Sequence, residues 1–404
     1  MRVSVALLGV FLLALPGLGR PPAAELPESL EVQVTGNPAD AEVIREAIAR
    51  RLEQTVRRLP GATVEIRLPG VPLLEPGEEV VLPVRVEARH PSGAPLARTV
   101  WVRLLNLLLP LSDPKRLVVS NNPERLRSPG LLLAERLGPG EAVRLLYHHQ
   151  NATGRGMVVL VRLKNPGPQP ARIHLQVAAP RPWHDTMAAG HAAARRFLQL
   201  VASGGGYVLE LPPHSAFTFW TQHLPVGFVV SGLLQAQLLE GEGLEIRVGL
   251  RPSYVLDPAP LPDLEPEPTG HPRGVFAHPV LEVRRRLAVG ASETVEVGAS
   301  RALRDLFTEA VLVGDYGVLY RLLLELTNPG PEAREARVAV RAAGGPAYAA
   351  FVANGQLLDL SYLAAGRARD LLTVPLPPAG SSTVTLLTVP SAGSYLPLHL
   401  FLRP

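Results

Sequence analysis

Asn-Pro-Gly-Pro occurs twice in this chain, within the stretches Leu163-Lys164-Asn165-Pro166-Gly167-Pro168 and Leu326-Thr327-Asn328-Pro329-Gly330-Pro331. The two asparagines, Asn165 and Asn328, are 163 residues apart. A second echo, Leu211-Pro212-Pro213 and Leu376-Pro377-Pro378, recurs at an offset of 165 residues. Two motifs that recur at nearly one spacing predict that the last two-thirds of the chain holds two copies of one β domain.

The Asn-Pro-Gly motif is typical of a turn. A proline biases the residue before it away from the α region, and glycine accepts a positive φ at little cost. Each copy of the motif follows an apolar run and precedes an alternating one. We therefore expect each motif to form a tight turn between antiparallel strands, at an equivalent hairpin in each copy.

The fold class follows from the spacing of the prolines and glycines. The 404 residues include 42 Pro and 36 Gly. Residues of these two types are disfavoured inside helices and central strands, so most of them must lie in turns or at the ends of short elements. Short alternating segments between Gly/Pro turns are typical of β sandwiches. The sequence predicts a mainly β protein with two tandem β-sandwich domains preceded by a small α/β module.

Helical spacing is clearest near the amino terminus. Apolar residues from Val43 to Leu59 recur at three- and four-residue intervals and predict an amphipathic helix from about Ala39 to Arg58, ended by Pro60-Gly61. Short helices are also expected at Thr186 to Leu200 and at Arg301 to Ala310.

The first residues have the form of a secretory signal peptide. Met1-Arg2 provides a positive start, Val5 to Leu15 is apolar, and small residues offer cleavage after Gly19 or Ala24. No later run reaches membrane length, and the chain has 0 Cys. We expect an exported protein (periplasmic, cell-surface or extracellular) without disulfides, lipid anchor or transmembrane span in the mature chain.

These features predict five segments. They are a signal peptide at 1–24, a small α/β plus β-hairpin module at 25–112, a first β sandwich at 117–252, a Pro-rich linker at 253–273, and a second β sandwich at 274–404.

Charge and motif content exclude several function classes. The net charge of +4 is small, and the densest basic run, Arg284-Arg285-Arg286, has no aromatic platform beside it. This argues against nucleic-acid binding. The chain contains no Cys nucleophile, GxSxG elbow, Walker loop or HExxH motif.

Histidines in the first copy are the one candidate for a metal centre. A transition metal could be held by His148, His149, His184, Asp185 and His191 if they met in space. Neighbouring His148 and His149 point to opposite faces of a strand, and the spacing matches no zinc signature. We interpret these residues as structural or surface histidines, and no metal or cofactor is predicted.

Two polar runs also allow two interpretations. Ser120-Asn121-Asn122-Pro123-Glu124 and Tyr147-His148-His149-Gln150-Asn151 are dense in hydrogen-bonding groups. They could line a sugar-binding groove, or they could form a turn and a capped loop in which Asn and Ser satisfy the local backbone. The second interpretation is the favoured one.

The same two runs, together with Asn165-Pro166-Gly167, the segment from Gly314 to Tyr320, and Asn328-Pro329, resemble exported bacterial proteins with repeated β domains. The resemblance covers roughly residues 117 to 400 and carries no known activity, cofactor or catalytic residue. It implies export and repeated β domains.

These observations favour an exported, non-catalytic protein that acts as a binding or structural element of the cell envelope. Its expected partners are an envelope protein or a polysaccharide. The alternative is a metal-dependent or carbohydrate-active enzyme with its site in the first sandwich, and the concentration of histidines in that copy is the feature that supports it.

Overall fold

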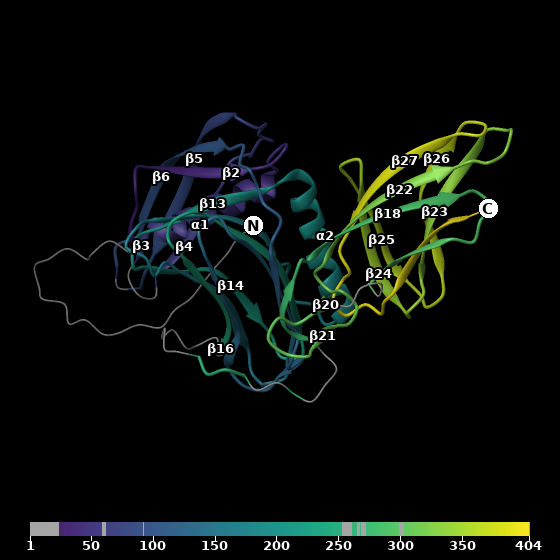
Figure 1. Ribbon diagram of the computed structural model, residues 1–404. Coiled ribbons are helices and arrows are strands. Elements are labelled where there is room, and N and C mark those ends of the chain that lie inside the picture. Colours follow the sequence, from purple (N-terminus) through teal and green to yellow (C-terminus); the bar gives the residue numbers. More distant parts are fainter. Residues whose placement is uncertain are drawn as a thin grey trace, which may run out of the picture.

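The computed structural model describes residues 24–58, 62–91, 93–252, 261–264, 267, 272–298 and 303–403. Figure 1 shows two β sandwiches side by side, with helix α2 (Thr186–Ser203) between them and the amino-terminal strands beyond the first sandwich. The fold is mainly β, as the sequence predicted. The predicted signal peptide lies, except for Ala24, outside the described residues, as does most of the predicted linker.

The first sandwich packs a large sheet against a smaller one. The smaller sheet has the order β14 (Ala216–Leu224), β11 (Met157–Lys164), β16 (Leu244–Pro252) and β9 (Gly130–Leu137). The large sheet begins with β17 (Arg273–Ala277), β7 (Arg116–Ser120), β10 (Ala142–Asn151), β15 (Val229–Glu240), β12 (Ala171–Ala178) and β13 (Gly206–Leu211), and β8 (Arg125–Leu126) pairs with the end of β10.

Most strands of the amino-terminal module continue this large sheet. β13 pairs with β2 (Ser29–Thr35), and the order then runs through β6 (Leu96–Asn106), β5 (Glu79–Arg89) and β4 (Thr63–Arg67). A separate two-stranded sheet joins β1 (Ala24–Glu25) to β3 (Arg57–Arg58).

Helix α1 (Ala41–Thr55) is the predicted amphipathic helix, shorter by a few residues at each end. It begins where the Asp40 side chain accepts hydrogen bonds from the backbone N–H groups of Glu42 (2.9 Å) and Val43 (2.8 Å). Its apolar face packs on β2 and β13. On that side the Tyr207 hydroxyl donates to Glu46 Oε1 over 2.9 Å, and burial raises the pKa of Glu46 to about 7.

The second sandwich is built from two sheets that lie entirely after residue 279. One has the order β18 (Val280–Ala288), β22 (Leu319–Thr327), β27 (Ser381–Thr388), β24 (Ala347–Ala353) and β25 (Gln356–Leu363). The other has the order β19 (Thr294–Val297), β28 (Leu398–Arg403), β23 (Arg334–Ala342) and β26 (Ala368–Leu376).

Strand pairing follows the same order in both sandwiches. The neighbours β14-β11 and β13-β12-β15-β10 of the first correspond to β27-β22 and β26-β23-β28-β19 of the second, all antiparallel. The sheets differ outside these neighbours: in the first sandwich β16 lies between β9 and β11, and in the second β24 and β25 follow β27. In the second, β18 pairs directly and in parallel with β22.

The Asn-Pro-Gly turns occupy equivalent connections, but these connections are not hairpins. β11 and β12 belong to opposite sheets of the first sandwich, as do β22 and β23 of the second. Each turn therefore carries the chain across the sandwich from one sheet to the other. In Greek-key sandwiches, strands that follow one another in sequence often lie in different sheets. The sequence therefore predicted the turn correctly but not the strands that it joins.

In the first sandwich, buried Asn165 ties its own turn to the second repeated motif. Its Nδ2 donates to the carbonyl oxygens of Gln169 (2.7 Å) and Pro212 (3.0 Å). Its Oδ1 accepts from the Gly167 N–H over 3.0 Å, and its own N–H donates to the Ser215 carbonyl over 2.8 Å. The Asn-Pro-Gly and Leu-Pro-Pro motifs thus form one hydrogen-bonded unit around a buried asparagine.

The second sandwich repeats this unit around buried Asn328. Its Nδ2 donates to the carbonyl oxygens of Glu332 (2.7 Å) and Pro377 (3.0 Å), and its Oδ1 accepts from the Gly330 N–H over 3.1 Å. Its N–H donates to the Gly380 carbonyl over 2.8 Å. The two repeated motifs recur at nearly the same offset because they contact each other in each sandwich.

Two sequence expectations need correction near the junction of the sandwiches. The strand β17 pairs with β7, so the large sheet of the first sandwich extends past the boundary predicted at residue 274. The helix predicted at Arg301 to Ala310 is wrong: residues 301–302 lie outside the described residues, and the rest forms the hairpin β20 (Leu303–Arg304) and β21 (Val311–Leu312). Asp305 accepts backbone N–H groups of Val275, Phe307 and Thr308, which holds the segment in a turn.

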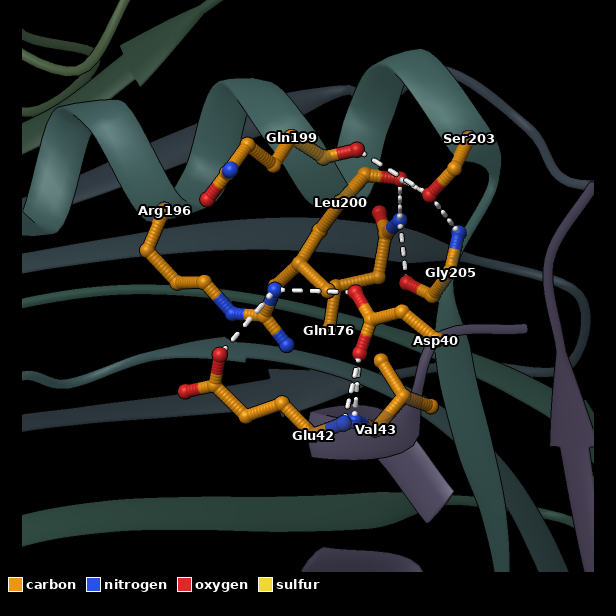
Figure 2. A network of polar contacts seen from close by, with 9 residues as sticks. All are labelled: Asp40, Glu42, Val43, Gln176, Arg196, Gln199, Leu200, Ser203 and Gly205. Carbon is orange, nitrogen blue, oxygen red and sulfur yellow. Dashed lines mark hydrogen bonds and ion pairs between the residues drawn. The ribbon is translucent and has the colours of Figure 1, made fainter. Parts of the chain in front are cut away.

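Helix α2 confirms the predicted helix at Thr186 to Leu200 and runs three residues further. It packs on β12 and β15 of the first sandwich and on β24 of the second. In Figure 2, Arg196 of α2 reaches Asp40 and Glu42 at the start of α1, at 3.0 and 3.5 Å. Gln176 of β12 donates to the carbonyl oxygens of Leu200 and Gly205, where α2 ends (Figure 2).

Within the described part of the chain, neither helix is long and apolar enough to cross a membrane.

Candidate functional site

The two polar runs of the first sandwich meet where β7 leads into β8 and where β10 ends. His148 and His149 are consecutive in β10 and point to opposite faces of the large sheet, as predicted for a strand. His149 faces inward: its Nδ1 lies 2.8 Å from the Pro123 carbonyl oxygen and its Nε2 lies 3.0 Å from Ser120 Oγ. Burial lowers the pKa of His149 to about 4, so the imidazole is neutral and serves as a structural bridge.

His148 faces the other way, toward the second sandwich, and lines a cleft of about 440 Å³. Ligand-binding pockets commonly have volumes of about 300–1,000 Å³. The cleft is bounded by both sandwiches and by the first turn of α2, and its walls are Asn121, Glu124, His148, Asp185, Thr186, Met187, Tyr316, Gly393, Ser394 and Tyr395.

The amino-terminal end of α2 provides one wall. Asp185 is the N-cap residue, and its Oδ1 accepts the Ala188 N–H over 2.9 Å, which fixes the carboxylate at the helix start. The helix lies very close to the second sandwich at Gly190. A Cβ at that position would fall 1.9 Å from the Ala392 carbonyl oxygen, so only glycine permits this approach.

The second sandwich provides the tyrosines of the cleft. The Tyr316 hydroxyl donates to the Ser394 carbonyl oxygen over 2.7 Å and so joins two loops of the wall. Burial raises the pKa of Tyr316 to about 12, so this hydroxyl keeps its proton. Tyr395 is 58% exposed at the edge of the cleft, which leaves its ring open to a ligand.

A buried arginine of the first sandwich forms hydrogen bonds to the second sandwich. Arg144 of β10 donates through Nη1 to the carbonyl oxygens of Pro279 (3.0 Å) and Gly317 (2.9 Å) and through Nη2 to Gln235 Oε1 (3.0 Å). Its guanidinium carbon lies 4.8 Å from the centre of the Phe197 ring of α2. Burial lowers the pKa of Arg144 to about 9, so it remains charged at neutral pH.

Outside this buried contact, Arg321 of β22 forms a two-pronged ion pair with Asp113, at 2.6 and 2.7 Å. Because Asp113 precedes the first sandwich and Arg321 belongs to the second, this exposed pair also spans the junction.

The five residues considered for a metal site are divided between different surroundings. His148 and Asp185 line the cleft, whereas His149 is directed into the first sandwich. The exposed His184 ring packs 3.6 Å from the ring centre of Phe228. His191 lies on α2, with its Nε2 3.0 Å from Asp359 Oδ1. Among the described residues, no group of three or more His, Asp or Glu side chains could hold a metal ion.

Several residues of the cleft were not identified from the sequence. Tyr316 falls within a segment that the resemblance included, but its role was not predicted. Met187, Ser394 and Tyr395 had no sequence signal, since they lie in short loops or a helix start far from the polar runs. Only the folded contact between the sandwiches brings these segments together.

No protein-family model and no curated protein sequence matches the chain. Among solved structures, the chain is similar to the CBM22-1–CBM22-2 tandem domain of Paenibacillus barcinonensis Xyn10C, at 9% identity, with 68% of this chain and 97% of that chain covered and a TM-score of 0.15. It is also similar to Lac15 from a marine microbial metagenome, at 13% identity, with 86% and 76% covered and a TM-score of 0.14. At such TM-scores neither likeness supports an argument about this chain.

Proposed function

We propose that this protein is an exported, non-catalytic binding protein of the cell envelope, and that the cleft between its sandwiches binds a saccharide. The observation that carries the proposal is the composition of the cleft. Five polar residues, Asn121, Glu124, His148, Asp185 and Ser394, line a space that two tyrosines border.

This combination suits a polyhydroxylated ligand. Each sugar hydroxyl can donate one hydrogen bond and accept others, so it matches a wall that mixes donors and acceptors. The apolar face of a sugar ring can pack on an aromatic side chain, and Tyr395 offers such a surface. Groups held by a strand, a helix start and a pinned loop are also pre-ordered, which lowers the entropic cost of binding.

Charge narrows the ligand class further. None of the described residues that line the cleft is Lys or Arg, whereas Glu124 and Asp185 are both carboxylates. A phosphate-rich ligand or a nucleic acid requires basic groups at the contact. The cleft therefore favours a ligand without strong negative charge.

Glycan binding by the purified mature protein tests this proposal. We expect the protein to bind at least one glycan on an array of neutral and charged polysaccharides. Tyr395→Ala should weaken that binding by roughly three- to tenfold, because it removes an aromatic surface. The control is Trp101→Ala, which removes another exposed aromatic residue (53% exposed) from β6, far from the cleft. A protein that binds no glycan, or equal losses in the two variants, would contradict the proposal.

Export is tested separately. We expect the protein to lie outside the cytoplasm and to lack residues 1 to about 24. The start of the chain has the charged residue, the apolar run and the small residues at a cleavage site that a signal peptide requires. Sequencing of the amino terminus after cell fractionation measures this. An intact Met1 on protein from the soluble cytoplasm would overturn it.

A further inference from the structure

Tyrosines continue beyond the cleft along the second sandwich. The chain has only 8 Tyr and 3 Trp, and Tyr316 and Tyr395 already border the cleft. Next to them, the backbone N–H of Tyr348 donates to Ser394 Oγ over 3.1 Å, so Tyr348 follows directly on the cleft wall. The Tyr362 ring lies 5.7 Å from the Tyr348 ring, edge to face. The two tyrosines of the cleft and the pair Tyr348 and Tyr362, joined to the cleft wall through Ser394, are called the tyrosine row below.

The far end of the tyrosine row is accessible. Tyr362 is 45% exposed, although most large apolar side chains of the second sandwich are buried. It belongs to β25, an edge strand, and Tyr348 belongs to the neighbouring β24. Their side chains lie on the face that α2 approaches, since the His191 ring of α2 is 4.9 Å from the Tyr348 ring.

Polar groups accompany this end of the row, as they do in the cleft. Asp359 of β25 lies 3.0 Å from His191 Nε2 and 3.1 Å from Arg195 Nε. Both partners come from α2, so the helix forms one side of the row from Asp185 to Arg195. Burial lowers the pKa of His191, which keeps the imidazole neutral and able to share a hydrogen bond.

Net negative charge along the row is concentrated in the cleft. The cleft contributes Glu124 and Asp185 without a basic residue among its described walls, and at the other end Asp359 is balanced by Arg195. A chain of uronic acids or phosphates would meet carboxylates at its first sugar unit. A neutral or amine-bearing chain would not.

We propose that Tyr348, Tyr362 and Asp359 form a second subsite, and that the protein binds a linear, neutral or amine-bearing glycan chain that extends from Tyr395 along the tyrosine row to Tyr362. This inference rests on the proposed function, because it assigns the length and charge of the ligand of the same cleft.

Titration calorimetry with oligosaccharides of increasing length tests the second subsite. The probes are cello-, xylo- and chito-oligosaccharides of two to six units, and oligogalacturonates of the same lengths. For the native protein, affinity for at least one neutral series should rise by roughly three- to tenfold between the shortest and longest members, because the added units contact Tyr362. The oligogalacturonates should bind more weakly.

Substitutions locate this gain. In Tyr362→Ala the affinity for the shortest oligosaccharide should remain, while the gain with length is lost. Tyr362→Phe keeps the ring and should keep the gain. Trp101→Ala serves as the control for loss of an exposed aromatic residue at a distance.

The two proposals fail in different ways. If short oligosaccharides bind and added length or Tyr362→Ala changes nothing, the second subsite is wrong and the saccharide cleft stands. Tighter binding of oligogalacturonates than of neutral chains also overturns the inference. If no probe of any length binds, both proposals are overturned.

Discussion

Asn165 and Asn328 show how a single side chain can define a fold. Each is buried, and each amide connects two loops that cross between the sheets of its sandwich. An aspartate could not donate the hydrogen bonds of Nδ2, and a glutamine would be too long for the same turn. The motif is therefore a structural clamp, and it occupies an equivalent connection in each sandwich.

Asn165→Ala is expected to destabilise the first sandwich by about 2–4 kcal/mol, because it removes every hydrogen bond that the buried amide makes to the two loops. Chemical denaturation measures this loss. Gln169→Ala is the matched control: Gln169 is exposed in the same turn, and it contributes only its backbone carbonyl to Asn165. Equal stabilities of the two variants would contradict the clamp.

Glu46 predicts a pH dependence of stability. Burial raises its pKa from 4.5 to about 7 in the folded protein. Between these values the folded state holds a proton that the unfolded state has released, so the free energy of unfolding falls as the pH rises from 4.5 to about 7. This contribution is fully present below pH 4.5 and lost above about 7.

Glu46→Gln cannot titrate and still offers an oxygen to the Tyr207 hydroxyl. We expect its unfolding free energy to fall less steeply than that of the native protein across the same pH interval. Urea denaturation at a series of pH values gives both slopes, and identical slopes would show that Glu46 titrates normally.

At the scale of elements, the pattern of residues predicted most of the structure where local rules decide. Apolar spacing predicts helix α1, although the structure places its N-cap at Asp40, and it also predicts the helix at Thr186. The helix predicted at Arg301 is wrong because Asp305 accepts a hydrogen bond from the backbone N–H of Val275 in a distant strand. Helical spacing does not reveal that contact. The hairpin predicted at Asn165 is wrong for a similar reason, since a turn motif does not show which sheet contains the next strand.

The cleft was even less accessible to sequence reasoning. Asn121, Glu124 and His148 belong to polar runs of the sequence, which allow a sugar-binding groove but favour a turn and a capped loop. Tyr395 lies more than two hundred residues away. Only the packing of α2 and the second sandwich brings these groups to one surface.

Gly190 predicts an unusual response to alanine within a helix. Alanine normally stabilises a helix interior by about 1 kcal/mol relative to glycine. Here the added Cβ would clash with the Ala392 carbonyl oxygen, so we expect Gly190→Ala to destabilise the protein by about 1–3 kcal/mol. Thermal unfolding and limited proteolysis between the sandwiches measure this, and a rise in melting temperature would show that α2 can move away at no cost.

At the scale of the whole molecule, both polar and apolar contacts cross the junction of the sandwiches. Arg144 reaches two carbonyl oxygens of the second sandwich, and Gly317 sits among Leu117, Leu146 and Leu233 of the first. A cleft formed by both sandwiches needs such a junction, since free rotation would separate its walls.

Arg144→Met is expected to loosen this junction and to cost about 2–4 kcal/mol, because buried acceptors lose their donor. Small-angle scattering should show a larger radius of gyration, and denaturation should separate into two transitions. Arg321→Met is the control: it breaks an exposed ion pair across the same junction and should cost no more than about 1 kcal/mol. The same scattering profile for both variants would contradict the role of Arg144.

The continuous large sheet has a consequence for how the chain folds. β2 lies between β6 and β13, and Gln33 of β2 pairs with Val208 of β13. One side of β2 therefore stays open until a segment made much later arrives. Such distant pairing slows folding, and an open strand edge invites association with other chains in the meantime. A chaperone that shields this edge while the chain is being made would protect it until β13 arrives.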